Sequence, residues 1–142
     1  SMTRVYGGTF WMMLFLTGFS GGSSFAEWVP IDGAYQLPAL RTIYIDPASV
    51  RKEHRLVTLS VLIDWKSMQG GRSPARFSST IVTKQIDCSG KRVRLLAATD
   101  FYGPMGTGVA TSGIGDRSQG LWTEIEPDSL SQGLGNMVCG TP

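Results

Sequence analysis

The sequence predicts an α+β fold that is mainly β: a single antiparallel β-sheet with a C-terminal helix packed on it and held by one disulfide. Three observations lead to this prediction. Apolar and polar residues alternate over Arg55–Trp65, which is typical of a strand with one buried face. Turn residues separate further strand-like segments into hairpins. The chain then ends in apolar residues at helical spacing, directly before the second of its two cysteines.

The first two predicted strands are Thr42–Asp46, which Pro47 stops, and Arg55–Trp65. They are expected to form a hairpin. The inward set of the longer strand is Val57, Leu59, Val61, Ile63 and Trp65. Leu62 falls among the polar residues of the other face and is the exception to the pattern.

A second hairpin is expected from Phe77–Ile86 and Lys91–Thr99, which flank the turn sequence Asp87–Gly90. In its second strand Val93, Leu95 and Ala97 should point inward, with Arg92 and Arg94 outward. The glycine-containing stretches 66–75 and 102–120 are expected to be loops.

A last strand is expected at Leu121–Ile125, followed by a helix over 128–138 that Asp128 or Ser129 can cap. Its predicted apolar stripe is Leu130, Leu134, Met137 and Val138. Gly133 and Gly135 weaken this helix by up to about 1 kcal/mol each relative to alanine. We therefore expect its order to come from packing on the sheet.

The N-terminal segment 1–26 has the pattern of a secretory signal peptide: Arg4, an apolar run from Phe10 to Phe19, and small residues ending in Ser24-Phe-Ala26. Ser1, which precedes Met2, is interpreted as a cloning remnant. The alternative is a membrane anchor, but the run is about half the roughly 20 residues that a spanning helix needs. Cleavage after Ala26 would leave 27–142 as one domain with no stable membrane insertion.

Export would carry the two cysteines, Cys88 and Cys139, into an oxidising compartment, where an even pair favours one disulfide. The alternative is two free thiols or half of a metal site. With His54 as the single histidine and no Cys-x-x-Cys, we expect no metal and no other cofactor.

The charge argues against nucleic acid as a partner. The net charge is +2, and Arg4 is the only charged residue of 1–26, so the remainder carries +1. No catalytic residue is predicted either. His54 lies in a charged turn, and Gly103–Gly108 lacks the Lys-Ser/Thr ending of a phosphate-binding loop.

Five basic residues form a candidate binding patch. Arg92 and Arg94 share the outer face of one predicted strand, and a separate turn carries Arg51, Lys52 and Arg55. If they meet, they would attract an acidic surface. The alternative is a solvated face, or a sheet edge protected by charge.

Several short motifs occur in an order that resembles the bacterial surface-adhesin protein E family. They are Tyr44-Ile-Asp-Pro-Ala-Ser-Val-Arg51, Leu62-Ile-Asp-Trp-Lys66, Asp87-Cys88, Lys91-Arg-Val-Arg-Leu95, Met105-Gly-Thr-Gly108 and Trp122–Ser129 leading to Val138-Cys139. The resemblance spans about 28–139. It implies an antiparallel sheet with a helix held by Cys88 and Cys139, adhesion to host matrix or serum proteins, and a dimer as one arrangement.

The sequence therefore predicts an exported envelope protein, in the periplasm or at the cell surface, that recognises a protein or other macromolecule without catalysis. A structural subunit of a periplasmic assembly is the main alternative. A small hydrolase or ligand carrier is the third hypothesis, and a deep apolar pocket would favour it.

Overall fold

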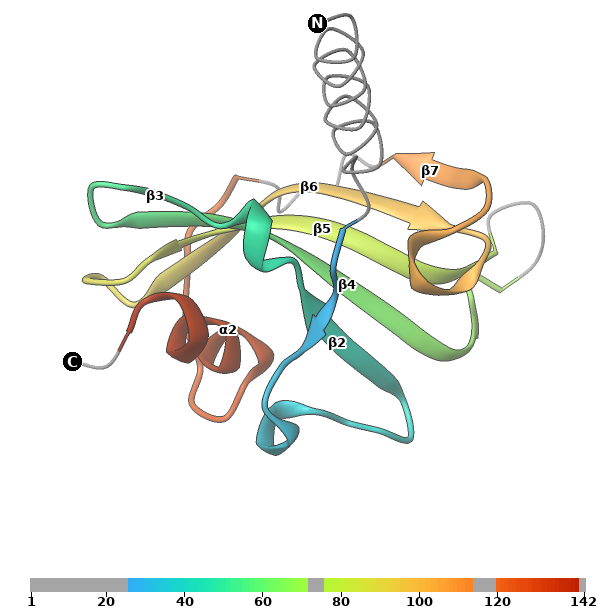
Figure 1. The fold of residues 1–142 in the computed structure, drawn as a ribbon, viewed down its shortest axis with the longest axis horizontal. Helices are drawn as coiled ribbons and strands as arrows, with labels where there is room; N and C mark the ends of the chain where they lie inside the picture. The colour runs from blue at the N-terminus through green and yellow to red at the C-terminus, as the bar shows by residue number, and fades with distance from the viewer. Residues whose placement is uncertain (1–25, 72–75, 114–119, 141–142) are drawn as a thin grey trace, which may run out of the picture.

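Strands dominate the structure, as the alternating pattern predicts. The structure is a computed structural model that describes residues 26–71, 76–113 and 120–140 (Figure 1). Most of the predicted signal peptide lies outside these ranges. The strands are β1 (Val29–Pro30), β2 (Arg41–Ile45), β3 (Arg51–Glu53), β4 (Leu56–Gln69), β5 (Phe77–Asp87), β6 (Arg92–Phe101), β7 (Ala110–Gly113) and β8 (Thr123–Glu124). The helical elements are η1 (Gly33–Tyr35), η2 (Pro47–Ser49), η3 (Pro104–Gly106) and α2 (Leu130–Val138).

The described strands form one antiparallel sheet in the order β1-β2-β4-β5-β6-β7, built on the long strands β4, β5 and β6. Both outer edges are completed by short strands. β3 pairs with β4 past the end of β2, and β8 pairs with β6 past the end of β7. The two predicted strand pairs, β2 with β4 and β5 with β6, are confirmed.

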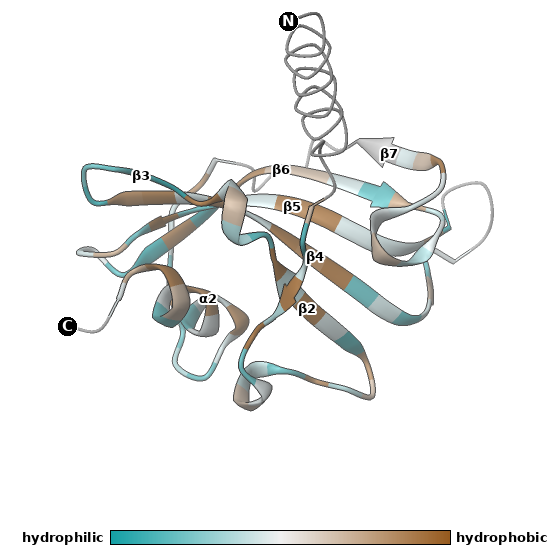
Figure 2. Cartoon of the chain, viewed as in Figure 1, coloured by the Kyte–Doolittle hydropathy of each residue, from teal (hydrophilic) through white to brown (hydrophobic). Residues whose placement is uncertain are grey.

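The main core lies on one face of this sheet, under α2, and we call this the helix face. Leu59 and Val61 of β4 are at most 1% exposed there, and Leu134 of α2 is fully buried. Figure 2 shows hydrophobic residues recurring along β2 and β4. The core cluster contains Ile31, Ile43, Ile45, Val57, Leu59, Val61, Val82, Ile86, Val93, Leu134 and Val138. The mainly antiparallel α+β fold is thus confirmed.

The helix α2 begins as the sequence predicts, with Ser129 as its N-cap accepting a hydrogen bond from the Gln132 amide. Leu134 and Val138, one turn apart, are buried. Met137 does not belong to this stripe, because it is 41% exposed. It precedes Val138 by one residue and so points about 100° away around the helix axis. The predicted place of Met137 in the core is wrong.

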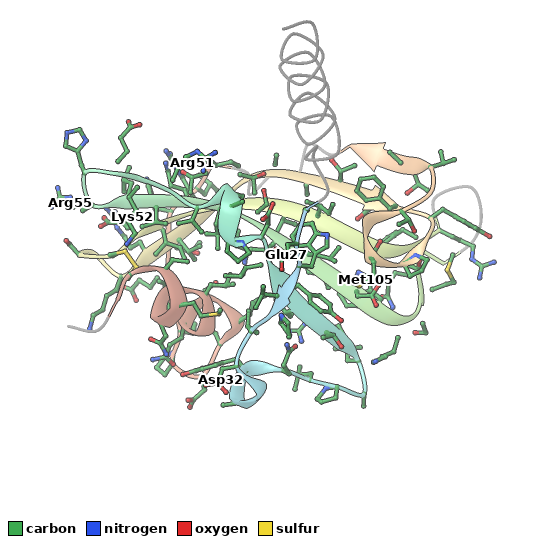
Figure 3. The ribbon with its side chains drawn as sticks, in the orientation of Figure 1. Glu27, Asp32, Arg51, Lys52, Arg55 and Met105 are labelled. Atoms are coloured by element: carbon green, nitrogen blue, oxygen red, sulfur yellow. A yellow bond between two sulfur atoms is a disulfide. The ribbon has the colours of Figure 1, made fainter. Side chains whose placement is uncertain are left out.

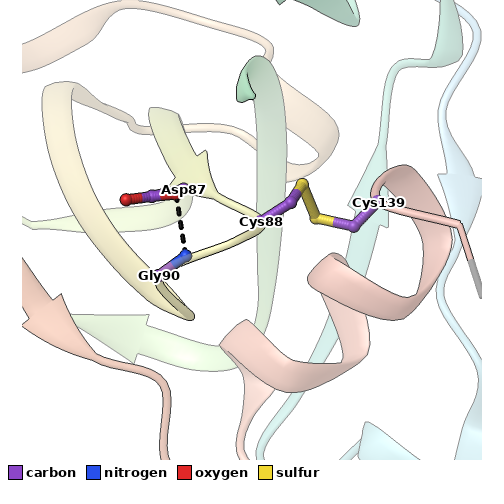
Figure 4. Close-up of a disulfide and its surroundings, with 4 residues drawn as sticks. All are labelled: Asp87, Cys88, Gly90 and Cys139. Atoms are coloured by element: carbon purple, nitrogen blue, oxygen red, sulfur yellow. Dashed lines mark hydrogen bonds between the residues drawn. A yellow bond between two sulfur atoms is a disulfide. The ribbon is translucent and has the colours of Figure 1, made fainter. Parts of the chain in front are cut away.

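A disulfide joins the turn after β5 to the end of α2 (Figure 4). Cys88 and Cys139 are 51 positions apart in sequence, yet their Cα atoms are 5.7 Å apart. Cys139 is the C-cap residue of α2. The predicted bridge is confirmed, and it ties the helix end to the margin of the sheet.

Leu62, the exception to the alternation in β4, is fully buried on the face opposite α2, which we call the open face. It is covered by η3. Gly106 lies against Ile81 and Leu62 so closely that a Cβ would come within 2.8 Å of the Ile81 Cδ1 atom. An apolar residue on the polar side of β4 therefore marks a second, smaller packing site.

Hydrogen bonds hold η3 on the open face. The Met105 amide donates to the Asp64 Oδ1 atom at 2.9 Å, and the Gly106 amide donates to the Ser79 Oγ atom at 2.8 Å. These two backbone donors are occupied within the chain. The Gly103–Gly108 segment is a cover for Leu62 in this fold.

A β-bulge overturns one predicted orientation in β6. Lys84 pairs with Leu95 and Thr83 pairs with Ala97, which leaves Leu96 as the extra residue. Ala97 is consequently exposed and points away from the core. The residue that continues the inward set is Ala98, which packs against the core cluster.

Three predicted boundaries also differ. β4 continues to Gln69, because Gln69 pairs with Phe77 where the sequence predicts a loop. β7 forms inside the stretch 102–120, which is predicted to be irregular, by pairing with the end of β6. Only Thr123 and Glu124 of the predicted last strand are in ladder pairing. All three boundaries are decided by pairing with a distant strand. Local residue patterns do not indicate such pairing.

Candidate functional site

A row of side chains crosses the open face at the end of the sheet farthest from η3. The strand register places Arg51 of β3 beside Thr58 of β4, and Gln85 of β5 beside both Thr58 and Arg94 of β6. Cross-strand partners point to the same face. Arg51 and Arg94 therefore lie in one row, with Thr58 and Gln85 between them.

Hydrogen bonds connect this row. Gln85 donates through Nε2 to the Thr58 Oγ1 atom at 3.2 Å, and Arg94 donates through Nε to the Gln85 Oε1 atom at 2.8 Å. At the other end the Arg51 Nη1 atom donates to the carbonyls of Ala48 and Val50. Both guanidinium groups are therefore held in place before any partner arrives.

Trp122 lies against Arg92 and Arg94, and we call these three residues the Arg–Trp stack. The guanidinium carbons are 5.2 Å and 4.5 Å from the centroid of the Trp122 ring. Both distances are in the range of cation–π interactions, each of which contributes ~0.5–1 kcal/mol at an exposed site. The stack presents an aromatic ring and two ordered cations together.

Arg92 is also paired with Asp87, whose Oδ2 atom lies 3.1 Å from the Arg92 Nη2 atom. The Gly90 amide donates to the Asp87 Oδ1 atom at 2.9 Å (Figure 4). The Gly90 amide and then Arg92 hold the pKa of Asp87 below its usual value of 3.8. Both stabilise the charged form of the carboxyl group.

This lowered pKa predicts a pH-dependent role for Asp87. The native state binds the Asp87 proton more weakly than the unfolded state, so the ionised carboxylate stabilises the fold above pH ~3.8. That contribution is lost as the pH falls through the lowered native value. Asp87→Asn should therefore be less stable than wild type at pH 7, with the difference disappearing at low pH. Urea unfolding at several pH values measures this.

Glu53→Gln is the matched control, because Glu53 is an exposed carboxylate two strands from Asp87. Its stability should follow the wild-type curve. If the stability of Asp87→Asn differed from that of wild type by the same amount at pH 7 and pH 2, the charge of Asp87 would not contribute to the stability of the fold.

The structure separates the five basic residues of the candidate patch. Arg51, Arg92 and Arg94 lie on the open face. Lys52 pairs with Val57, which is buried in the main core, so Lys52 points to the opposite side of the sheet from Arg51. Arg55 lies in the turn of the β3–β4 hairpin (Figure 3). His54 is exposed in that turn with a positive φ of 59°.

Carboxylates lie among the open-face arginines. The register places Glu53, Asp87, Arg92 and Glu124 in the row next to Arg51 and Arg94. The three arginines thus face three carboxylates, and the local formal charge is close to zero. Such a surface favours specific pairing and stacking over long-range attraction of an acidic partner.

The sequence does not indicate whether Trp122 is buried in the core or lies on a binding surface. It precedes Thr123, which pairs with Val93 between the two arginines. The pairing of β8 with β6 brings Trp122 to the stack, and the two segments are about thirty residues apart. The alternation of Arg92 and Arg94 with Val93 indicates an outward pair, but no local pattern indicates which aromatic residue meets it.

Groups of three or more potential metal-ligating side chains are absent from the described ranges. None of the described helices is long and apolar enough to cross a membrane. A hollow of about 520 Å³ lies beside the disulfide and is lined partly by Lys91, Ile125, Gly135 and Cys139.

Comparison with known proteins identifies both a family and a fold. A family model described as Surface-adhesin protein E matches residues 28–140. The structure of crystal form II of Haemophilus influenzae protein E is similar with a TM-score of 0.64 at 11% identity, covering 82% of this chain and 90% of that one. Protein E from non-typeable Haemophilus influenzae gives 0.61 at 10% identity, covering 83% and 78%. A comparison with curated protein sequences gives no match.

Proposed function

We propose, from the premise that this chain belongs to the surface-adhesin protein E family, that it binds a macromolecular partner through the Arg–Trp stack and does so without catalysis. The partner class is a host matrix or serum protein. Retention in the periplasm as a subunit of an envelope assembly is the competing function. The observation that carries the proposal is Trp122, half-buried and stacked on Arg92 and Arg94 on the open face.

The composition of the stack supports protein binding. Tryptophan and arginine are enriched among the residues that contribute most to protein–protein affinity. Here Arg92 and Arg94 are ordered in the free chain by Asp87 and Gln85, so these two side chains have little entropy left to lose on binding. The neighbouring carboxylates balance the charge of the arginines, so we expect the affinity to change little with ionic strength. Removal of the Trp122 ring should change it more.

Trp122→Ala is expected to weaken partner binding by roughly tenfold to a hundredfold, the range for loss of a central aromatic contact. Tyr102→Ala is the matched control, since Tyr102 is a 57% exposed aromatic residue at the other end of the sheet. The full chain should be tested against a panel of immobilised matrix and serum proteins by biolayer interferometry. Loss of binding in Tyr102→Ala with retention in Trp122→Ala would place the binding surface elsewhere.

Protease treatment of intact cells expressing the same variants separates the two functions. Digestion of the wild-type protein on intact cells agrees with surface display and adhesion. Protection until the outer membrane is opened would favour the periplasmic subunit. The partner should then be sought in envelope extract, with Trp122→Ala again as the negative control.

A further inference from the structure

The hollow beside the disulfide lies on the opposite side of the sheet from the Arg–Trp stack. Its volume of about 520 Å³ is in the range of sites that bind small organic molecules. Ile86, which is fully buried in the main core, lines the hollow, and so does Ile125, which packs against that core. The exposed residues Pro127 and Gly140 line it as well. The hollow therefore extends from the surface to the apolar core.

The lining combines an apolar wall with one positive charge. The disulfide between Cys88 and Cys139 adds an uncharged surface to the wall that Ile86 and Ile125 form. Lys91 is the charged residue of the lining, and the described residues that line the hollow include no carboxylate. A ligand with a hydrocarbon part and a negatively charged end matches both features.

Two hydrogen-bond donors of the lining have no acceptor within the described ranges. The Lys91 ammonium group makes neither an ion pair nor a hydrogen bond there. The Gln132 Oε1 atom accepts a hydrogen bond from the Asp128 amide, which orients the side-chain amide and leaves its Nε2 atom as an unused donor. Asn136 differs, because its Nδ2 atom donates to the Tyr35 hydroxyl. Lys91 and Gln132 are therefore available to an acceptor from outside the chain.

Gly135 leaves the α2 side of this hollow open. Glycine inside a helix costs about 1 kcal/mol relative to alanine. The close approach of Tyr35 explains the glycine at position 133. At Gly135 the φ angle is not positive, and no atom beyond the adjacent residues and the backbone of α2 lies within 4 Å of an added Cβ. Neither packing nor backbone conformation requires glycine there, and a position that gives up stability in this way is typical of a functional site.

We propose that this hollow is a binding site for a small amphipathic carboxylate. The carboxylate accepts hydrogen bonds from Lys91 and Gln132. The hydrocarbon part lies against Ile86, Ile125 and the disulfide, in the space that Gly135 leaves open. The site is separate from the surface proposed for macromolecular binding, so variants of one site should leave the other intact.

The test uses the full chain with sodium octanoate, sodium acetate and 1-octanol, each at the same ionic strength set with sodium chloride. Isothermal titration calorimetry measures binding, and thermal unfolding measures stability. One octanoate should bind per chain and raise Tm relative to chloride alone. Acetate lacks the hydrocarbon part and 1-octanol lacks the charge, so both should bind more weakly than octanoate.

Two variants test the two halves of the site. Lys91→Met should weaken octanoate binding by about tenfold or more, because it removes a charged donor, and should leave 1-octanol binding unchanged. Gly135→Leu should weaken the binding of both compounds by about tenfold or more, because the new side chain occupies the hollow. Without ligand its Tm should be at least that of wild type, since leucine is the better helix former.

Lys66→Met is the matched control, since Lys66 is an exposed lysine at the opposite end of the sheet and does not line the hollow. It should bind octanoate as wild type does. The proposal would be overturned by octanoate binding at several sites per chain, or by acetate binding as tightly as octanoate. Octanoate binding that neither Lys91→Met nor Gly135→Leu weakens would place the ligand elsewhere and overturn it too. Lys91→Met gives this answer even if leucine at position 135 prevents folding.

Discussion

Replacing Cys88 and Cys139 together with serine is expected to reduce the free energy of unfolding by on the order of 4 kcal/mol. The chain-entropy model gives this value for a closed loop of about fifty residues, and the two cysteines are 51 positions apart. Without the bond, the unfolded ensemble gains the freedom that the loop now restricts. For a domain this small, that is a large part of the total stability. Urea unfolding measures the difference.

The loss should appear first in α2. This helix has nine residues and two glycines, so it is too short to be stable alone in water. Its order depends on Leu134 and Val138 in the core and on the bond at Cys139. Hydrogen exchange by mass spectrometry should show α2 exchanging faster in the serine variant while the centre of β4 remains protected.

Reduction of the wild-type protein provides the control. Wild type in reductant should unfold at the same urea concentration as the double-serine variant, and the variant itself should not respond to reductant. A serine variant as stable as oxidised wild type would mean that packing alone holds α2 on the sheet.

Gly133→Ala and Gly135→Ala are expected to change stability in opposite directions, although the two positions lie in the same helix. At Gly133 a Cβ would come 2.7 Å from the Tyr35 Cγ atom and 2.9 Å from two further atoms of that residue. The Tyr35 hydroxyl accepts a hydrogen bond from Asn136 Nδ2 at 3.0 Å, which restrains the ring. Overpacking of this kind costs about 1–3 kcal/mol.

At Gly135 no atom beyond the adjacent residues and the backbone of α2 lies within 4 Å of an added Cβ, because this residue lines the hollow beside the disulfide. Alanine there should raise stability by up to ~1 kcal/mol through its higher helix propensity. Thermal unfolding of both variants gives the comparison. Stabilisation of both by alanine would show that η1 and Tyr35 can move away from α2 without cost.

Much of the fold can be predicted from local patterns of residues, each of which is compatible with one type of secondary structure. The alternation of Val57, Leu59 and Val61 requires one buried sheet face. The matching face of a helix is indicated by Leu130, Leu134, Met137 and Val138, of which Met137 is wrong. The two cysteines are predicted to form a disulfide because export and an even count favour one. Each of these predictions depends on residues close in sequence or on a count.

The sequence by itself determined the sheet, the terminal helix, the disulfide and the family resemblance. Only the tertiary structure decided what covers Leu62, where β6 bulges, which basic residues share a face and which aromatic ring meets Arg92 and Arg94. Short-range periodicity determines the direction of a side chain relative to its own strand. The residues that this side chain contacts depend on pairing between segments tens of residues apart. That pairing is selected by the free energy of the whole fold.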